Sequence, residues 1–231
     1  RLIERLAALG AHAIAFDIVF AEPDRTSPAH LVSLWPDRPE LSVLREQVAT
    51  GSLPDHDQLL ARAIAAAPVV AGFTLTNVRS GGAESASAVW REPLRKAGVA
   101  YAGEDPRPYV TAMAGVVANL PIVEAAAAGN GHFTLLAERD GMTRRVPLLL
   151  RFGDHLYPSL AAEALRVAQG ASTYVIKSSR ASSERTWSEA TGVVSLKVGA
   201  LIIPTDAQGR LWVYYTAAAP QRTISAGDLL E

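Results

Sequence analysis

Two apolar stretches with a helical pattern between them constrain the fold more than any other feature of the sequence. Ala13–Phe20 and Val69–Leu75 are almost continuously apolar, which is typical of strands that are covered on both faces of a sheet. Between them, Asp57–Ala67 carries apolar residues at helical spacing, and Asp55 followed by Gln58 is typical of a helix start. Strand, helix and strand in this order predict two adjacent parallel strands with the helix as their crossover.

The second half of the chain favours antiparallel strands. Gly131–Leu136 and Thr143–Phe152 flank an Asp-Gly pair, which predicts a hairpin. Thr173–Lys177, Val193–Val198 and Leu201–Ile203 follow as further strand candidates. The expected fold is therefore α/β: a partly parallel sheet with flanking helices, joined to a C-terminal antiparallel portion. Residues 1–231 are expected to form a single domain.

Long irregular segments separate these elements. Ala21–Pro54 is interrupted repeatedly by proline, and a segment of this length inside a compact domain is either functional or a mobile insertion. Strand fragments are expected around Val89 and Val99. The two chain ends, Arg1–Leu9 and Ser225–Leu230, both have helical patterns, and we expect them to leave the domain on the same side.

Composition excludes several classes of function. Hydrophobic residues make up 49% and charged residues 19% of the chain, as in a globular protein, and a net charge of −1 gives no basic surface for nucleic acid. Without cysteine, disulfides, cysteine–zinc sites and thiol nucleophiles are excluded. The histidines are far apart, and no nucleotide-binding or hydrolase motif is present. We therefore expect no cofactor, no metal and no catalytic residue.

Four stretches, taken in order, carry a family resemblance. They are Gly10–Phe20 with Glu22, Pro23 and Asp24; Asp57–Ile64; Gly131–Phe133 with Arg139–Leu148 and Tyr157–Ala161; and Ile203–Arg210 with Ile224–Leu230. Together they resemble the type-two CHASE domain, the extracellular sensory module associated with cyclases and histidine kinases. Thr134 stands where that family's pattern has asparagine.

The resemblance implies a location and a set of partners. Such a domain is the extracytoplasmic, periplasmic portion of a bacterial inner-membrane protein, here excised from a longer chain. Transmembrane helices and a cytoplasmic output domain belong to the same chain, and the output is an adenylate or guanylate cyclase or a histidine kinase. The domain receives a small-molecule or environmental signal, and it is a possible homodimer.

Five charged residues are candidate ligand contacts. Asp17 is expected near the carboxyl end of the first strand, where ligands of open α/β sheets gather, and Glu22 and Asp24 follow in the next loop. They could bind a cation or an amine, or Asp17 could accept local hydrogen bonds while the other two are solvated. Arg144 and Arg145 could bind an anion, pair with Asp17 or Asp24, or form ordinary ion pairs.

Two other functions remain open from the sequence. The chain could be a periplasmic metal-assisted hydrolase built on Asp17 and Asp24. It could also be a constitutive dimerisation module that only holds cytoplasmic domains together. His132, on a predicted strand, is interpreted as a packed residue rather than a ligand.

Overall fold

The computed structural model describes residues 1–78, 91–180 and 192–231. The helices are α1 (Leu2–Ala8), α2 (Pro28–Leu34), α3 (Ser42–Ala49), α4 (His56–Ala65), α5 (Pro121–Ala126), α6 (Leu160–Ala168) and α7 (Ala226–Leu230). The strands are β1 (Ile14–Phe16), β2 (Val69–Thr76), β3 (Gly98–Ala102), β4 (Ala112–Met113), β5 (Gly115–Val117), β6 (Gly129–His132), β7 (Arg145–Pro147), β8 (Leu149–Phe152), β9 (His155–Pro158), β10 (Thr173–Ser178), β11 (Val193–Val198), β12 (Leu201–Pro204) and β13 (Arg210–Trp212). The strand fragment expected near Val89 lies outside the described residues, whereas the one near Val99 is β3.

A mainly parallel sheet is built around β2. β1 and β6 lie on opposite sides of β2 and both run parallel to it, while β5 pairs antiparallel with the last residues of β2. The sequence prediction of adjacent parallel strands joined through α4 is confirmed. The start of α4 is also as predicted, because the Asp55 side chain accepts a hydrogen bond of 3.1 Å from the Gln58 N–H.

Helices cover both faces of this sheet. α4 and α5 supply Ile64 and Val123 to a core that includes Val69 and Ala71 of β2. On the opposite face, α6 lies against β6. This approach requires glycine in β6, because a Cβ on Gly131 would lie 2.7 Å from Leu160 Cα at the start of α6.

Two side chains extend the hydrogen bonding of β2 beyond its strand partners. Asn119 donates to Gly72 O at 2.8 Å and accepts from Phe20 N–H at 2.7 Å, so it fills the space between β1 and β5. On the other side, Thr134 Oγ1 accepts from Leu75 N–H at 2.7 Å and donates to Leu75 O at 3.0 Å. Thr134, the residue that departs from the family pattern, therefore provides hydrogen-bond partners for the backbone N–H and C=O of Leu75 in β2.

A second unit is formed by the later strands. β12, β11 and β10 are antiparallel neighbours, and β3 adds to β10 in parallel. Two smaller sheets, β4-β8-β9 and β13-β7, complete this unit. Tyr174, Ile176, Leu196 and Val198 are buried in its core together with Leu149. The predicted mixed α/β class, with antiparallel strands towards the C-terminus, is confirmed.

Two sequence predictions about strands were wrong. The first strand ends at Phe16 instead of Phe20, and Ile18, expected on its apolar side, is 53% exposed. The predicted hairpin of Gly131–Leu136 with Thr143–Phe152 does not form. β6 instead pairs with β2, and β8 pairs with β9 and β4. An Asp-Gly pair favours a local turn, but it does not determine which strands pair across the turn.

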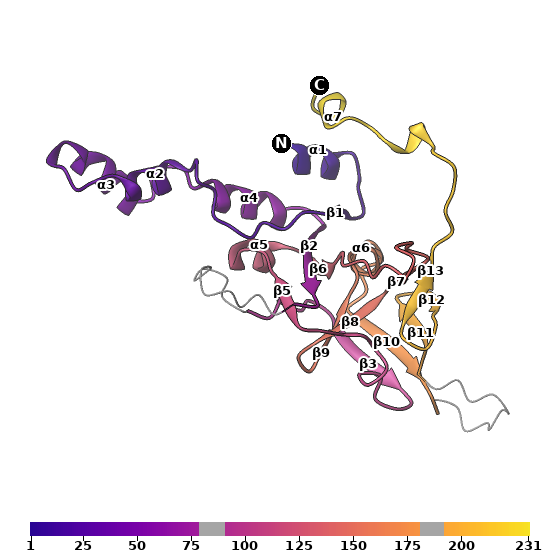
Figure 1. The fold of residues 1–231 in the computed structure, drawn as a ribbon. Coiled ribbons are helices and arrows are strands. Elements are labelled where there is room, and N and C mark those ends of the chain that lie inside the picture. Colours follow the sequence, from indigo (N-terminus) through magenta and orange to yellow (C-terminus); the bar gives the residue numbers. More distant parts are fainter. Residues whose placement is uncertain (79–90, 181–191) are drawn as a thin grey trace.

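Two extensions project from the body of the molecule (Figure 1). The predicted excursion Ala21–Pro54 contains α2 and α3, which form an arm beyond α4. At the other extension, α1 and α7 pack together, and Arg5 Nε donates to Leu229 O at 3.2 Å. The prediction that both chain ends lie on the same side is confirmed.

Candidate functional site

The three predicted acidic residues are not gathered around a common point. The Asp17 side chain is exposed and makes no hydrogen bond or ion pair within residues 1–78, 91–180 and 192–231. Glu22 pairs with Arg25 at 2.6 Å. Asp24 accepts from Thr26 N–H at 2.9 Å and lies 2.5 Å from His56 Nδ1. These contacts, the Thr26 backbone first, lower the pKa of Asp24 to about 2.

The two predicted arginines pair with other residues. Arg144 binds Glu138 and Asp140 at 3.1 and 2.8 Å. Arg145 also binds Glu138, at 3.2 Å, and its guanidinium lies 4.7 Å from the centre of the Trp212 ring. Neither contacts Asp17 or Asp24, so the ordinary ion pair weighed from the sequence is what forms.

A buried ion pair with full hydrogen bonding joins the two units of the fold. Glu163 and Arg166 of α6 form two hydrogen bonds of 2.7 and 3.0 Å, and the Tyr174 hydroxyl of β10 donates to Glu163. Arg166 also donates to Ala128 O, next to β6, at 2.9 Å, and to Ala171 O at 2.7 Å. Burial, reinforced by Glu163, raises the pKa of Tyr174. We call Glu163, Arg166 and Tyr174 the satisfied cluster.

A second group of buried polar side chains contrasts with the first. Glu124, Asn130, His132 and Tyr157 are 0%, 3%, 1% and 1% exposed. Within the described part of the chain, Glu124 Oε1, Asn130 Oδ1, both ring nitrogens of His132 and the Tyr157 hydroxyl have no hydrogen-bond partner. Buried polar atoms are usually satisfied, so five such atoms in four residues need an explanation. We call these four residues the unsatisfied cluster.

The backbone of β6 and neighbouring aromatic rings hold this cluster together. Asn130 and His132 are two residues apart on a strand and therefore project from the same face, opposite the glycines that meet α6. The Asn130 amide donates to Glu124 O at 3.3 Å. Phe73 has its ring centre 6.4 Å from that of His132 and 5.8 Å from that of Tyr157.

Residues 91–97, the covering segment, lie over part of the unsatisfied cluster without regular secondary structure. Arg91 pairs with Glu124 Oε2 at 2.8 Å. Leu94 N–H donates to the same carboxylate at 3.0 Å, while Leu94 O accepts from the Asn130 amide at 2.9 Å. Lys96 Nζ donates to Ala125 O at 2.7 Å. The covering segment is therefore held mainly through Glu124 and Asn130, and it continues directly into β3.

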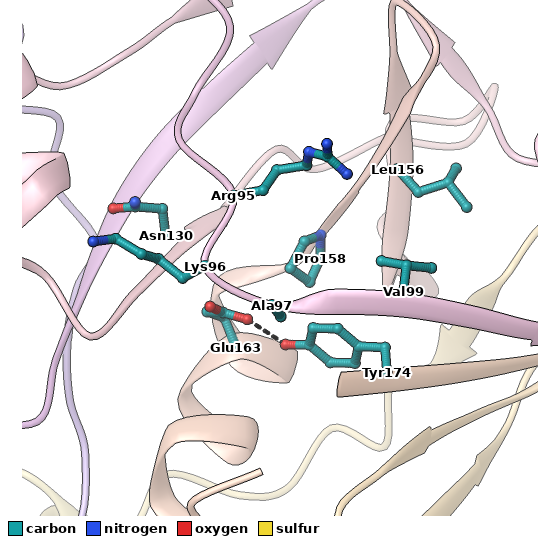
Figure 2. A pocket seen from close by; sticks show the side chains of 9 residues that line it. All are labelled: Arg95, Lys96, Ala97, Val99, Asn130, Leu156, Pro158, Glu163 and Tyr174. Carbon is teal, nitrogen blue, oxygen red and sulfur yellow. Dashed lines mark hydrogen bonds between the residues drawn. The ribbon is translucent and has the colours of Figure 1, made fainter. Parts of the chain in front are cut away.

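A small cavity is lined by members of both clusters (Figure 2). Its volume is about 10 Å³, roughly the room for one water molecule. It is lined by Arg95, Lys96, Ala97, Val99, Asn130, Leu156, Pro158, Glu163 and Tyr174. Asn130 of the unsatisfied cluster and Glu163 and Tyr174 of the satisfied cluster therefore border the same cavity.

Burial shifts the pKa values of several groups in and near the unsatisfied cluster. Desolvation lowers the pKa of His132 to about 3, so its ring is neutral near pH 7. Burial also raises the pKa of Tyr157 to about 12. Desolvation lowers the pKa of Lys96, although the Glu124 charge acts in the opposite direction.

A larger groove lies between the arm and α4. Its volume is about 290 Å³, and it is lined by Ala29, Val48, Gly51, Leu53, Pro54, Asp55, Gln58, Leu59 and Arg62. Asp55 already caps α4. None of the lining side chains has a buried polar atom without a partner.

Sequence reasoning missed most of the unsatisfied cluster. It interpreted His132 correctly as a buried, packed residue, and it did not single out Glu124, Asn130 or Tyr157. One signal was available, because polar residues alternate with glycine in Gly129–His132. That alternation indicates a strand whose glycine face lies close to another backbone segment and whose opposite face is polar.

Comparison with known proteins agrees with this architecture. The chain is a mixed α/β domain of a sensory class: extracellular modules found in signalling proteins. The family model of the CHASE2 domain matches residues 1–231, and the chain belongs to this family. The resemblance found in the sequence is thereby confirmed, and the family is one of sensors, not of catalysts. No curated protein and no solved structure matches the chain. Among the described residues, no helix has the length and apolar character needed to span a bilayer.

Proposed function

We propose that residues 1–231 are a single periplasmic sensing domain of a bacterial inner-membrane receptor. In this proposal, the domain is part of a longer chain that also contains transmembrane helices and a cytoplasmic output domain. The output is an adenylate or guanylate cyclase or a histidine kinase. The domain itself receives a stimulus or a small molecule and passes the signal on mechanically.

The packing of α1 against α7 is the observation that carries this proposal. Both chain ends lie at one pole of the domain (Figure 1), joined by the hydrogen bond between Arg5 and Leu229. A compact domain held to a membrane at both ends needs its ends on the side that faces the membrane. Proximity of chain ends is common in single domains, so the support comes from this packing together with the CHASE2 family.

A sensor also needs two conformations of comparable free energy, between which a stimulus selects. The covering segment leads into β3, which pairs with β10 in the second unit. From β12 the chain continues through β13 to the exposed segment that ends in α7. A displacement of the covering segment is thus transmitted through the second unit to the C-terminal end.

Cysteine labelling tests the location of the domain. The chain has no cysteine, so Thr216→Cys, at an exposed position, introduces a single thiol. In the full-length protein, with any cysteine outside this domain replaced by serine, a membrane-impermeant maleimide should label this thiol in intact spheroplasts. Labelling only after the inner membrane is broken would contradict the proposal.

A homodimer is a second proposal, favoured by apolar side chains on the extensions. Leu34 and Val43 on the arm are 66% and 61% exposed, and Tyr214 near the C-terminal end is 87% exposed. Exposed apolar patches often mark interaction sites. Light scattering on the purified domain should give twice the monomer mass, and a monomer at high concentration would refute the proposal.

The hydrolase alternative and the five candidate ligand residues have less support. Asp17 is exposed, and Asp24 is engaged by Thr26 and His56. Within residues 1–78, 91–180 and 192–231, no group of three or more His, Asp or Glu side chains is arranged to hold a metal ion. Ligand contacts at Asp17, Glu22, Asp24, Arg144 and Arg145 remain predictions.

A further inference from the structure

We infer that the free edge of β3 pairs with the β3 of a second copy of this chain, antiparallel and across a two-fold axis at Ala100. The inference rests on the homodimer proposed above and deepens it, because the exposed apolar residues of the extensions do not show how two copies meet. In this arrangement the four-stranded sheet that contains β3 is joined to the same sheet of the second copy, and the two form one continuous sheet.

β3 leaves one side of its backbone unpaired. It lies at the end of the strand order β12-β11-β10-β3, and β10 is its strand neighbour in the described structure. The Gly98 N–H donates to Ser172 O at 3.0 Å, and backbone groups alternate in direction along a strand, so every second residue from Gly98 directs its groups to β10. The N–H and C=O groups of Val99 and Tyr101 therefore point outward, and none of them is hydrogen-bonded to a described residue.

β3 also lacks the features that normally prevent an edge strand from pairing. Natural edge strands carry charged residues, proline or a bulge, whereas Gly98–Ala102 contains no charged residue and no proline, and its register with β10 is regular. The opposite edge of the same sheet, β12, ends in Pro204, which has no N–H to donate. The sheet is thus protected at its β12 edge and open at its β3 edge.

The side chains of β3 continue the core face of the sheet to this edge. Tyr101 is the register partner of the buried Ile176 in β10, so its side chain lies on the core face. It is nevertheless 51% exposed, and no described strand lies beyond it. Antiparallel pairing about Ala100 puts the Tyr101 of one copy opposite the Val99 of the other. An aromatic ring beside a β-branched side chain is a favourable cross-strand pair.

The sequence around β3 identifies the partner as a second copy. From Arg95 to Asp105 it reads Arg-Lys-Ala-Gly-Val-Ala-Tyr-Ala-Gly-Glu-Asp, with cations before the strand, carboxylates after it, and small residues placed symmetrically about Ala100. Antiparallel pairing about Ala100 brings Arg95 to the Asp105 of the second copy. One residue nearer the axis, Lys96 meets Glu104. Both pairs have opposite charges, whereas parallel pairing would set like charges side by side, which is destabilising.

The charged residues are available for these contacts to different degrees. Arg95 is exposed and forms no ion pair with a described residue. Asp105 and Glu104 each bind an arginine of their own chain, at 2.7 and 3.0 Å, but a carboxylate can accept from more than one donor. Lys96 Nζ already donates to Ala125 O at 2.7 Å. The pair of Arg95 with Asp105 is therefore the main electrostatic contact across the axis.

A disulfide across the axis tests the arrangement. The chain has no cysteine, so Ala100→Cys introduces one thiol. This thiol faces its copy in a non-hydrogen-bonded pair, with Cα atoms about 4.5 Å apart, which is within the reach of a disulfide. Val175→Cys is the matched control, because Val175 is the register partner of Ala100 in β10, and its copy lies about 14 Å away across the intervening strands. Mild oxidation should convert most of the Ala100→Cys chain, and little of the Val175→Cys chain, to a dimer on a non-reducing gel.

Proline substitutions test the hydrogen bonds across the axis. Tyr101→Pro removes an outward N–H at an edge position, where a sheet tolerates proline, and it should raise the dissociation constant of the dimer about tenfold. Ile202→Pro makes the same change at the opposite edge, because Thr205 N–H donates to Val194 O and the Ile202 N–H therefore points outward from β12. This control should leave the dissociation constant unchanged. Sedimentation equilibrium measures both variants.

Charge exchange tests the register at surface positions, where folding is not at risk. Arg95→Glu and Asp105→Lys should each weaken the dimer, because each sets like charges across the axis. A mixture of the two variants should form a heterodimer, in which both pairs again have opposite charges. Arg62→Glu, at an exposed arginine on α4, is the control and should dimerise normally. Native mass spectrometry distinguishes the heterodimer from the two homodimers.

The outcomes separate this interface from the proposals on which it rests. A wild-type dimer with no preferential disulfide at Ala100→Cys, or with the same dissociation constant after Tyr101→Pro and after the charge changes, overturns the β3 interface and leaves the homodimer. A wild-type monomer overturns both. Neither result bears on the location of the domain, which the labelling of Thr216→Cys decides.

Discussion

The satisfied and unsatisfied clusters both contribute to the lining of one cavity, and they differ in whether their polar atoms have hydrogen-bond partners. In Glu163, Arg166 and Tyr174, every polar side-chain atom has a hydrogen-bond partner. In Glu124, Asn130, His132 and Tyr157, five atoms have none among the described residues. The low dielectric of the interior strengthens the first arrangement and makes the second costly. In the satisfied cluster, the buried polar groups make the fold more rigid. In the unsatisfied cluster, the burial of polar groups is not explained by stability.

The largest expected effect is in the satisfied cluster. Glu163→Gln leaves the buried Arg166 guanidinium without its anionic partner, so the free energy of unfolding should fall by about 3–5 kcal/mol. Urea unfolding measures this change. Glu92→Gln, at an exposed position 3.6 Å from His155, is the control and should lose less than about 1 kcal/mol. Equal losses of unfolding free energy in the two variants would mean that the buried Glu163–Arg166 pair contributes no more than an exposed pair.

The same change in two tyrosines sharpens the comparison. Tyr174→Phe removes a hydrogen bond to a buried carboxylate and should cost about 2 kcal/mol. Tyr157→Phe removes a hydroxyl that has no partner in the described structure, so it should leave the free energy of unfolding unchanged or raise it. Thermal and urea unfolding of the two variants, side by side, provide the measurement. A greater loss in Tyr157→Phe would show that its hydroxyl is bonded after all.

Acid should act on the unsatisfied cluster through His132. Its pKa is lowered by burial from 6.5 to about 3 in the folded protein. The unfolded chain therefore binds the proton first, so this contribution to stability is complete above pH 6.5 and is lost as the pH falls from 6.5 towards 3. Between pH 7 and pH 5 the loss should be about 2 kcal/mol.

His132→Phe isolates that contribution. The variant keeps a ring against Phe73 but cannot titrate, so the difference in unfolding free energy between the two proteins should grow as the pH falls. Parallel pH dependence of the wild type and the variant would mean that His132 is accessible to protons in the folded state.

The smallest effect is expected beside the cluster, at the continuation of β6. Thr134→Val keeps the shape of the side chain but removes both hydrogen bonds to Leu75, which should cost about 1 kcal/mol. Thr134→Ser keeps the hydroxyl and serves as the control. If serine is the more damaging substitution, the methyl group, and not the hydrogen bonds, is what matters at this position.

Local patterns allowed much of the parallel unit to be predicted. The Asp55 cap and the almost continuous apolar run of Val69–Leu75 depend only on neighbouring residues, so they were visible in the sequence. β6 was predicted only in part, as the start of a strand over Gly131–Leu136, and its pairing with β2 was not predicted. Gly129–His132 contains no apolar residue, and it is a strand through its pairing with β2 and the close approach of α6. The hairpin prediction failed for the same reason.

The site was harder to predict than the fold. Glu124 and Tyr157 are buried by tertiary packing, and no pattern in their neighbouring residues indicates that they lie near Asn130. The five residues chosen from the sequence were charged and near turns, where charged groups are usually paired or solvated. The structure shows this for Glu22, Asp24, Arg144 and Arg145.

The adjacency of α1 and α7 determines which movements can carry information in a receptor of the proposed kind. When the whole domain tumbles or is pushed by its surroundings, both helices shift by the same amount, and nothing changes between the two membrane segments joined to them. Only sliding or twisting of one helix against the other differs from this background. Because α1 and α7 are neighbours, motion of the whole domain leaves their relative position unchanged. Only a conformational change inside the domain alters that position and reaches the membrane segments.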